Sequence, residues 1–279
     1  IMRKISRRSF LSAAAVCGAA AALTACGGSA SSTASSTASS AASSEAASTS
    51  AAAELTTVEA GKLTMATNAA FPPYEMTTDA GEFEGIDIDT AKAIAEKLGL
   101  ELQIDDMDFD AALLSVQQGK ADIVMAGVTV TDERKAVMDF SDSYATGIQS
   151  IIVPEGSDIT SPDDLAGKKI GTQRGTTGYI YCSDDFGDDA VVAYDDGLTA
   201  VQALNNGQVD AVVIDNAPAK EFVAANPGLV ILDTSYAEED YAIGMAKGSS
   251  LEAAVNAALE ELKADGTLQS IVDKYITAE

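Results

Sequence analysis

The sequence predicts an α/β protein built from parallel strands that alternate with helices. Between residues 62 and 126, candidate strands and amphipathic helices follow in the order β-α-β-α-β, which is typical of a doubly wound parallel sheet. The same alternation returns between residues 168 and 225. A chain with two such stretches is expected to form two similar lobes, each with its own core.

An internal repeat supports the two-lobe prediction. Residues 112–127 read ALLSVQQGKADIVMAG and residues 200–215 read AVQALNNGQVDAVVID, so that a helix, a glycine stop and a strand recur in register. Gly127 and Asp215 therefore lie at equivalent strand ends. Because ligands of open α/β sheets bind outside the carboxyl ends of strands, we expect these two ends to meet in one cleft.

Hydrophobic periodicity and glycine or proline stops set the expected element boundaries. Expected strands cover 62–68, 100–104, 121–126, 148–153, 168–173, 191–194, 211–214, 230–232 and 241–246. Expected helices cover 89–98, 109–118, about 178–183, 197–206, a stretch from 216, 251–263 and 267–275. The double proline at 72–73 predicts a loop, and Ser161-Pro162 predicts a helix start. Asp122 and Asp210 are expected to be turn or solvent residues.

The first 26 residues predict an export signal. Four basic residues between 3 and 8 precede an Ala-rich apolar core at 10–25, which is too short for a transmembrane helix. The core ends in Leu23-Thr-Ala-Cys26, which resembles a bacterial lipoprotein box, and this resemblance implies a diacylglycerol on the Cys26 sulfur. Residues 6–11, SRRSFL, resemble a twin-arginine motif, and the general secretory route is the alternative.

Residues 27–54 are almost entirely Ser, Ala, Thr and Gly, a composition that predicts a flexible tether. We expect the lipid on Cys26 to hold the folded part at the outer face of a bacterial cell membrane. The chain has 17 basic against 43 acidic side chains and a net charge of -26, which disfavours nucleic acid as a partner.

The composition also excludes several kinds of chemistry. Histidine is absent, which removes Ser-His-Asp and Cys-His catalysis and every His-ligated metal site. Cys182 would be alone after export and is expected to be a buried, inert thiol. We therefore expect no metal and no cofactor.

Arginine is rare beyond the signal, where only Arg134 and Arg174 occur. A guanidinium grips a carboxylate or phosphate with two parallel bonds, and Arg134 closely follows the strand end at Gly127. The alternative is a surface residue that balances its acidic neighbours. Residues 174–178, RGTTG, join a strand to a helix and predict an anion site for phosphate or carboxylate. Asp215 is equally compatible with a helix N-cap.

Several spaced motifs resemble the family 3 solute-binding proteins, the substrate-binding lipoproteins of bacterial ABC importers for polar amino acids. The segments are 67–75, 85–89, 127–134, 139–141, 164–178, 211–215 and 264–268. The resemblance implies an α/β fold of the periplasmic-binding-protein type II, with two Rossmann-like lobes joined by two hinge strands. Lobe 1 would comprise 55–145 plus 241–279, and lobe 2 would comprise 146–240.

The resemblance also implies which residues bind the ligand. Arg134 corresponds to the arginine that holds the ligand α-carboxylate, and Asp215 to the acceptor for its α-ammonium. The other expected binding residues are Thr176 and Thr177 for the carboxylate, Gly127 and Thr129 for the ammonium, Phe71 and Phe109 around the side chain, and Asn68 and Gln173. Asn68 stands where many binders of basic amino acids have Asp, which points to a neutral polar ligand. Glu75 nearby keeps a basic ligand open.

The function implied is binding of an L-amino acid in an interlobe cleft and its delivery to an ABC permease and its ATPase. We expect a monomer without enzymatic activity. An enzyme of the same fold, an exported dehydratase similar to cyclohexadienyl dehydratase, is the alternative, because a pocket acid can do proton chemistry. A sensor ectodomain is disfavoured, because no membrane span or output domain is recognised in the sequence.

Replacement of Cys26 by Ser is expected to release the protein from membranes or to block its maturation, because the lipobox thiol is the predicted lipid acceptor. Membrane fractionation and mass spectrometry of the N-terminal peptide measure this. An unmodified Cys26 in membrane-bound protein would refute the anchor.

Overall fold

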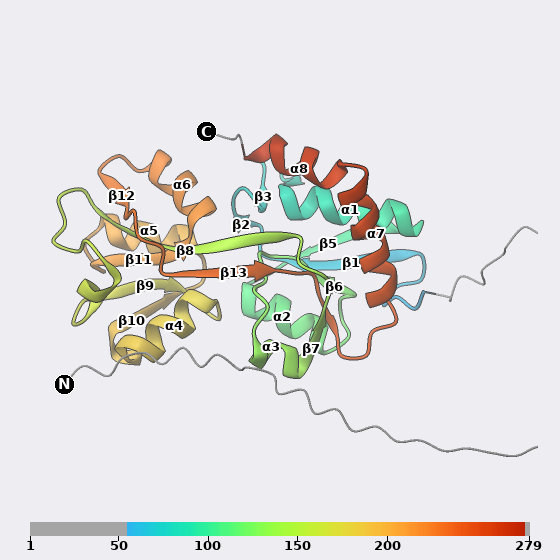
Figure 1. The fold of residues 1–279 in the computed structure, drawn as a ribbon, viewed down its shortest axis with the longest axis horizontal. Helices are drawn as coiled ribbons and strands as arrows, with labels where there is room; N and C mark the ends of the chain where they lie inside the picture. Colours follow the sequence, from blue (N-terminus) through green and yellow to red (C-terminus); the bar gives the residue numbers. More distant parts are fainter. Residues whose placement is uncertain (1–54, 277–279) are drawn as a thin grey trace, which may run out of the picture. The chain divides into compact units, whose positions relative to one another are not determined.

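The computed structural model describes residues 55–276, so the predicted signal, the tether and Cys26 lie outside the described part. The described chain is α/β, as predicted, and it contains two large sheets and one small sheet. Figure 1 shows β8 and β13 as long strands that pass from one sheet to the other.

The first sheet has the strand order β5-β1-β6-β14-β7. Its strands are β1 (Lys62–Thr67), β5 (Glu101–Asp106), β6 (Ile123–Val124), β7 (Met138–Phe140) and β14 (Gly244–Ala246). The strand β1 is parallel to β5 and β6, whereas β14 is antiparallel to β6 and β7. In this sheet β14 alone runs against the other four strands, which agrees with the β-α-β order of the sequence.

Helices cover both faces of the first sheet, with α1, α7 and α8 on one side and α2 on the other (Figure 1). Their bounds are α1 (Ile86–Leu98), α2 (Phe109–Gln117), α3 (Asp132–Val137), α7 (Glu252–Ala264) and α8 (Thr267–Tyr275). Side chains of β1 alternate between the two layers: Leu63 and Met65 pack with the core of α1, and Ala66 packs with that of α2. Such alternation buries both faces of the strand.

The second sheet has the order β10-β9-β11-β8-β12, and β13 also pairs with β8. Its strands are β8 (Ala145–Pro154), β9 (Ile170–Gln173), β10 (Val191–Tyr194), β11 (Ala211–Asp215), β12 (Leu229–Ile231) and β13 (Ala237–Tyr241). The helices are α4 (Thr177–Phe186), α5 (Gly197–Asn205) and α6 (Asn216–Ala225), with short 3-10 turns η1 (Pro162–Leu165) and η2 (Asp188–Ala190). The strands β9, β10 and β11 are mutually parallel, as the second β-α-β stretch predicts.

Two antiparallel strands connect the sheets. The strand β8 follows β7 of the first sheet and pairs with β13 from Ala145↔Tyr241 to Gln149↔Ala237. The strand β13 then leads through two residues to β14. The single strand predicted at 241–246 is therefore wrong: the chain leaves one sheet at Tyr241 and joins the other at Gly244.

Other boundaries differ from the expectation for local reasons. The predicted strand at 121–126 is only two residues long, and Ser161 starts a 3-10 turn, although its capping box with Asp164 is present. A small sheet of β2 (Ala70–Phe71), β3 (Glu75–Thr77) and β4 (Phe83–Glu84) was not predicted, because strands this short carry no periodicity. The helix α1 begins directly after Gly85, where φ is 131°.

Asp122 lies in the bend that precedes β6, which agrees with the turn expected there, but it is not a solvent residue. Its side chain is buried, and its two carboxylate oxygens accept the backbone N–H groups of Val58 at 2.7 Å and Thr64 at 2.8 Å. The repeat-related Asp210 is exposed, and accepts the N–H of Lys169 at 2.7 Å. Both aspartates thus fix the start of a neighbouring parallel strand.

Replacement of Asp122 by Ala is expected to lower the free energy of unfolding by about 2–4 kcal/mol, because two backbone donors lose their acceptor in a buried place. The matched change Asp210→Ala removes one exposed bond and should cost about 1 kcal/mol or less. Urea denaturation of both variants measures the difference. Equal losses would show that burial at Asp122 does not matter.

Candidate functional site

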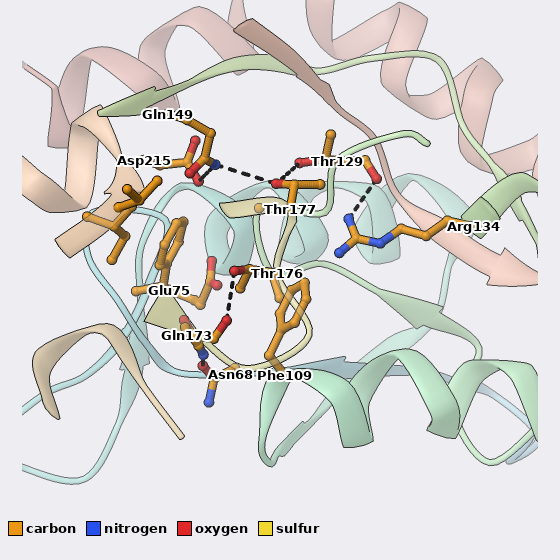
Figure 2. Close-up of a pocket in the computed structure, with 15 residues that line it drawn as sticks. Asn68, Glu75, Phe109, Thr129, Arg134, Gln149, Gln173, Thr176, Thr177 and Asp215 are labelled. Atoms are coloured by element: carbon orange, nitrogen blue, oxygen red, sulfur yellow. Dashed lines mark hydrogen bonds between the residues drawn. The ribbon is translucent and has the colours of Figure 1, made fainter. Parts of the chain in front are cut away.

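A cavity lies where the carboxyl ends of strands from both sheets meet (Figure 2). It is lined by the ten residues that the sequence predicted, namely Asn68, Phe71, Phe109, Gly127, Thr129, Arg134, Gln173, Thr176, Thr177 and Asp215. The lining also contains Glu75, Ala126, Gln149, Val213 and Ile214. Arg174 is not among the lining residues; its side chain is half-exposed and lies 3.5 Å from Asp195.

Arg134 is a buried cation rather than a surface residue. The hydroxyl of Thr131 caps α3 by accepting the backbone N–H of Arg134 at 3.2 Å, which fixes the start of the side chain. The guanidinium donates to the carbonyls of Thr129 at 2.8 Å and Gly175 at 3.1 Å, and lies 5.4 Å from the Phe109 ring centre. Within residues 55–276, no carboxylate forms a salt bridge with Arg134.

Burial therefore lowers the pKa of Arg134 from its usual value. A desolvated guanidinium that contacts only carbonyls and an aromatic ring is incompletely compensated. Its two protein hydrogen bonds use two of the five N–H groups that an arginine carries. The remaining donors are suited to a carboxylate or another anion in the cavity.

The start of α4 contributes donors to the same cavity. The hydroxyl of Thr176 caps the helix by accepting the Tyr179 N–H at 3.3 Å and donates to the Gln173 carbonyl at 2.8 Å. The hydroxyl of Thr177 donates to Glu239 at 3.0 Å. Because both hydroxyls and the Tyr179 N–H are engaged, the backbone N–H groups of Thr177 and Gly178 are the first-turn donors that remain for an anion.

Glu239 and Gln149 were not identified from the sequence. Glu239 is buried on β13, and its Oε2 accepts from the Thr129 hydroxyl at 3.1 Å and the Gln149 amide at 2.9 Å. Gln149 lies on β8 and also donates to Asp215 at 2.9 Å. A polar residue inside the apolar run at 148–153 was an available signal for Gln149. Glu239 lies within the acidic sequence Glu238-Glu-Asp240, which looks like a solvated surface.

Asp215 occupies the N-cap position of α6, but its side chain makes no capping hydrogen bond within the described chain. One oxygen accepts from Gln149, whereas the other is buried without a protein partner among residues 55–276. Burial raises the pKa of Asp215 to about 7, and the charge of Glu239 adds to this increase. Asp215 thus lines the cavity with a buried carboxylate that does not serve as a cap.

Apolar and amide side chains complete the walls. Phe71 and Phe109 are both buried and line the cavity. The Asn68 amide donates to the Met107 carbonyl at 3.0 Å and accepts from Gln173 at 2.8 Å, so both of its polar atoms are paired. Gly127 has φ 54°, and a Cβ there would lie 2.9 Å from the Phe71 ring, so that this position requires glycine.

Residues 63–278 match the family described as bacterial extracellular solute-binding proteins, family 3. The chain belongs to this family. The chain is similar to the L-cystine-binding protein TcyJ of Escherichia coli, with 32% identity over 226 residues that cover 79% of this chain and 85% of TcyJ. The L-arginine-binding protein of Pseudomonas aeruginosa is 31% identical over 236 residues, which cover 80% of this chain and 91% of the relative.

Solved structures support the same assignment. ArtJ of Geobacillus stearothermophilus, an arginine-, lysine-, histidine-binding protein, has a TM-score of 0.75 at 35% identity, and the match covers 78% of this chain and 96% of ArtJ. An ancestral arginine-binding protein bound to glutamine has a TM-score of 0.75 at 43% identity, with coverage of 78% and 99%. The predicted type II periplasmic-binding-protein fold is therefore confirmed.

Residues 4–24 match the signal sequence of the twin-arginine translocation pathway, which supports export and agrees with the SRRSFL motif. Among the described residues, no helix has the length and apolar character needed to cross a bilayer. Cys182 is buried, as predicted, and burial raises the pKa of its thiol to about 12.

Replacement of Asp215 by Asn is expected to stabilise the ligand-free protein more at pH 8 than at pH 5. The pKa of Asp215 is raised to about 7, so folding favours its protonated form, and this acid lowers stability as the pH rises from its unfolded pKa toward 7. Asn does not titrate, so the variant does not lose this stability. Its free energy of unfolding at pH 8 should exceed that of the parent by on the order of 2–4 kcal/mol.

Thermal unfolding at the two pH values measures the effect. The exposed Asp210→Asn is the control and should show no such difference between pH 5 and pH 8. A gain for Asp215→Asn that is the same at both values would contradict the buried-charge interpretation.

Proposed function

We propose that the cavity binds an L-amino acid and that the protein delivers this ligand to an ABC-type permease and its ATPase. The observation that carries the proposal is the pair of buried, incompletely compensated charges, Arg134 and Asp215, that face one cavity. A zwitterion supplies the opposite charge to each. Arg134 takes the α-carboxylate together with the N-terminus of α4, and Asp215 takes the α-ammonium.

The remaining lining residues have matching roles in this proposal. The Gly127 carbonyl and the Thr129 hydroxyl assist Asp215 with the ammonium group, and Phe71 and Phe109 enclose the ligand side chain. The relatives named above as amino-acid-binding proteins support the substrate class. The proposed ligand site uses no cofactor and no metal.

Hinge closure around the ligand couples binding to transport. The proposed lobes are 55–145 plus 241–279 and 146–240, with β8 and β13 as hinge strands. Hydrogen bonds already join the cavity walls of the two proposed lobes, among them those from Arg134 to the Gly175 carbonyl at 3.1 Å, from Gln173 to Asn68 at 2.8 Å and from Thr129 to Glu239 at 3.1 Å. A ligand held from both sides binds the closed arrangement better than an open one and shifts the population toward it.

The N-terminal sequence supports a location outside the cytoplasm at the membrane. We propose that Cys26 carries the lipid and that residues 27–54 tether a monomeric binding domain within reach of the permease. The match to an export signal supports the first step of this route.

Replacement of Arg134 by Ala is expected to weaken amino-acid binding by about 2–5 kcal/mol, because the carboxylate then stays buried without its partner. Arg134→Lys keeps the charge but loses the two-pronged geometry, so binding should weaken in that variant too. Calorimetry with the amino acid and its amide on each protein makes the measurement. The amide lacks the carboxylate and should gain nothing from Arg134.

Arg174→Ala is the matched control, since Arg174 is the other arginine of residues 55–276 and does not line the cavity. It should leave both affinities unchanged. An equal loss for acid and amide in Arg134→Ala would mean that the arginine acts through the structure, and the carboxylate role would be abandoned.

The buried acids also support a second candidate, a dehydratase of the same fold, because a carboxyl with a raised pKa can donate a proton near neutral pH. The purified protein incubated with prephenate or arogenate distinguishes the two. Turnover of prephenate or arogenate that is lost in Asp215→Asn would favour the enzyme. Binding of an amino acid, without turnover of either compound, favours transport.

A further inference from the structure

The chain bends at Gly127, just after it leaves the first sheet. The Met125 N–H still donates to the Ala66 carbonyl at 3.2 Å, and the Val128 carbonyl accepts a backbone N–H from the connection between β13 and β14 at 3.1 Å. Between these two attachments, the Gly127 N–H donates to Oδ2 of Asp87 at 3.0 Å. No described residue donates to the Gly127 carbonyl. This residue of the cavity lining thus has an open acceptor, and Asp87 holds it from its other side.

Asp87 lies in the first turn of α1, but the needs of a helix start do not explain it. Its side chain is 0% exposed. Asp89, the other acid of this turn, is half-buried and pairs with Lys274 at 2.7 Å. Asp89 already supplies the negative charge that favours the N-terminus of a helix. Because burial of a second carboxylate costs free energy, Asp87 requires another explanation.

The start of α1 is a rigid support for this side chain. The N–H of Ile86 donates to the Pro73 carbonyl at 3.0 Å, and the N–H of Asp87 donates to the Tyr74 carbonyl at 2.8 Å. The chain enters the helix through Gly85, where φ is 131° and a Cβ would collide with the Tyr74 carbonyl. Asp87 is therefore held by its own backbone before its carboxylate reaches Gly127.

The bond from Gly127 to Asp87 does not depend on titration of the acid. Glu75 and Tyr144 lie beside the carboxylate, and burial raises the pKa of Asp87 to about 6, whereas the Gly127 N–H and then Tyr144 lower it. A carboxyl group keeps an acceptor oxygen whether it is ionised or protonated. Oδ2 of Asp87 can therefore accept the Gly127 N–H in both states.

We propose that Asp87 is a positioning residue of the amino-acid site, and that its bond to the Gly127 N–H holds the Gly127 carbonyl in place for the α-ammonium group of the ligand. The proposal rests on the proposed amino-acid site. Gly127 has φ 54°, and a glycine adopts either sign of φ with similar ease, so that its carbonyl direction needs an anchor. Asp215 ends the repeat-related strand and supplies a carboxylate to the same ammonium group.

Binding of an amino acid and of its α-hydroxy acid separates this role from a structural one. The probe is whichever of the twenty L-amino acids raises the melting temperature of the parent protein most. In the α-hydroxy acid a single O–H donor replaces the ammonium group, and the charged Asp215 is the stronger acceptor for it. Asp87→Ala should therefore weaken the amino acid by about 10-fold or more, because the ammonium group loses an acceptor. The hydroxy acid should stay within a few-fold of the parent.

Asp87→Asn is the conservative variant. Its amide oxygen can accept the Gly127 N–H, and its NH₂ group meets buried oxygens of Glu75 and Tyr144 that lack partners among residues 55–276. Its amino-acid affinity should stay within a few-fold of the parent. Asp87→Leu fills the place of the side chain without an acceptor and should behave as Asp87→Ala does, which excludes a cavity as the cause.

The exposed Glu96→Ala removes an acid from the same helix and is the matched control, so it should change neither affinity. An equal loss of both ligands in Asp87→Ala and Asp87→Leu would mean that Asp87 supports the cavity as a whole. A loss in Asp87→Asn as large as in Asp87→Ala would assign the effect to its charge. Either result overturns the positioning role, and so does an unchanged amino-acid affinity in Asp87→Ala. A parent protein that binds none of the twenty amino acids instead overturns the proposed function itself.

Discussion

One oxygen of Glu239 joins the cavity walls to the strands that connect the two sheets. It accepts from Thr129 after β6, from Thr177 at the start of α4 and from Gln149 on β8, at distances between 2.9 and 3.1 Å. Glu239 itself lies on β13. Because donors from three separate segments converge on one buried carboxylate, a shift of any segment costs a charge-assisted hydrogen bond. The relative placement of the cavity residues therefore depends on this acceptor.

Near Glu239 the fold buries charged side chains of the cavity without giving them oppositely charged partners. Arg134 donates to two backbone carbonyls, and Asp215 accepts from one amide. Each arrangement lowers stability, because a desolvated charge needs a partner or must give up its charge. The raised pKa values of Asp215 and Glu75 express this cost. Charged groups held this way on rigid elements are typical of a binding site completed by its ligand.

The sequence was most informative where local patterns decide the structure. The glycine stops at Gly99 and Gly119 both have positive φ, and the β-α-β order predicted the parallel sheets. Prediction failed where tertiary context decides: the run at 241–246 belongs to two sheets. The motif-bearing loops gave the expected cavity lining. Gln149 and Glu239 escaped because they come from the connecting strands, where pairing between distant segments brings them to the cavity.

The contacts across the cavity explain how closure and ligand binding can reinforce each other. Arg134 uses two N–H groups on protein carbonyls, and the bond from Gln173 to Asn68 joins neutral amides. None of these bonds has to break for an anion to reach the remaining guanidinium donors. A ligand with complementary charges therefore adds bonds to walls that are already joined by their own. A neutral molecule of the same size fills the volume but leaves the buried charges desolvated, so selection in this cavity follows charge more than shape.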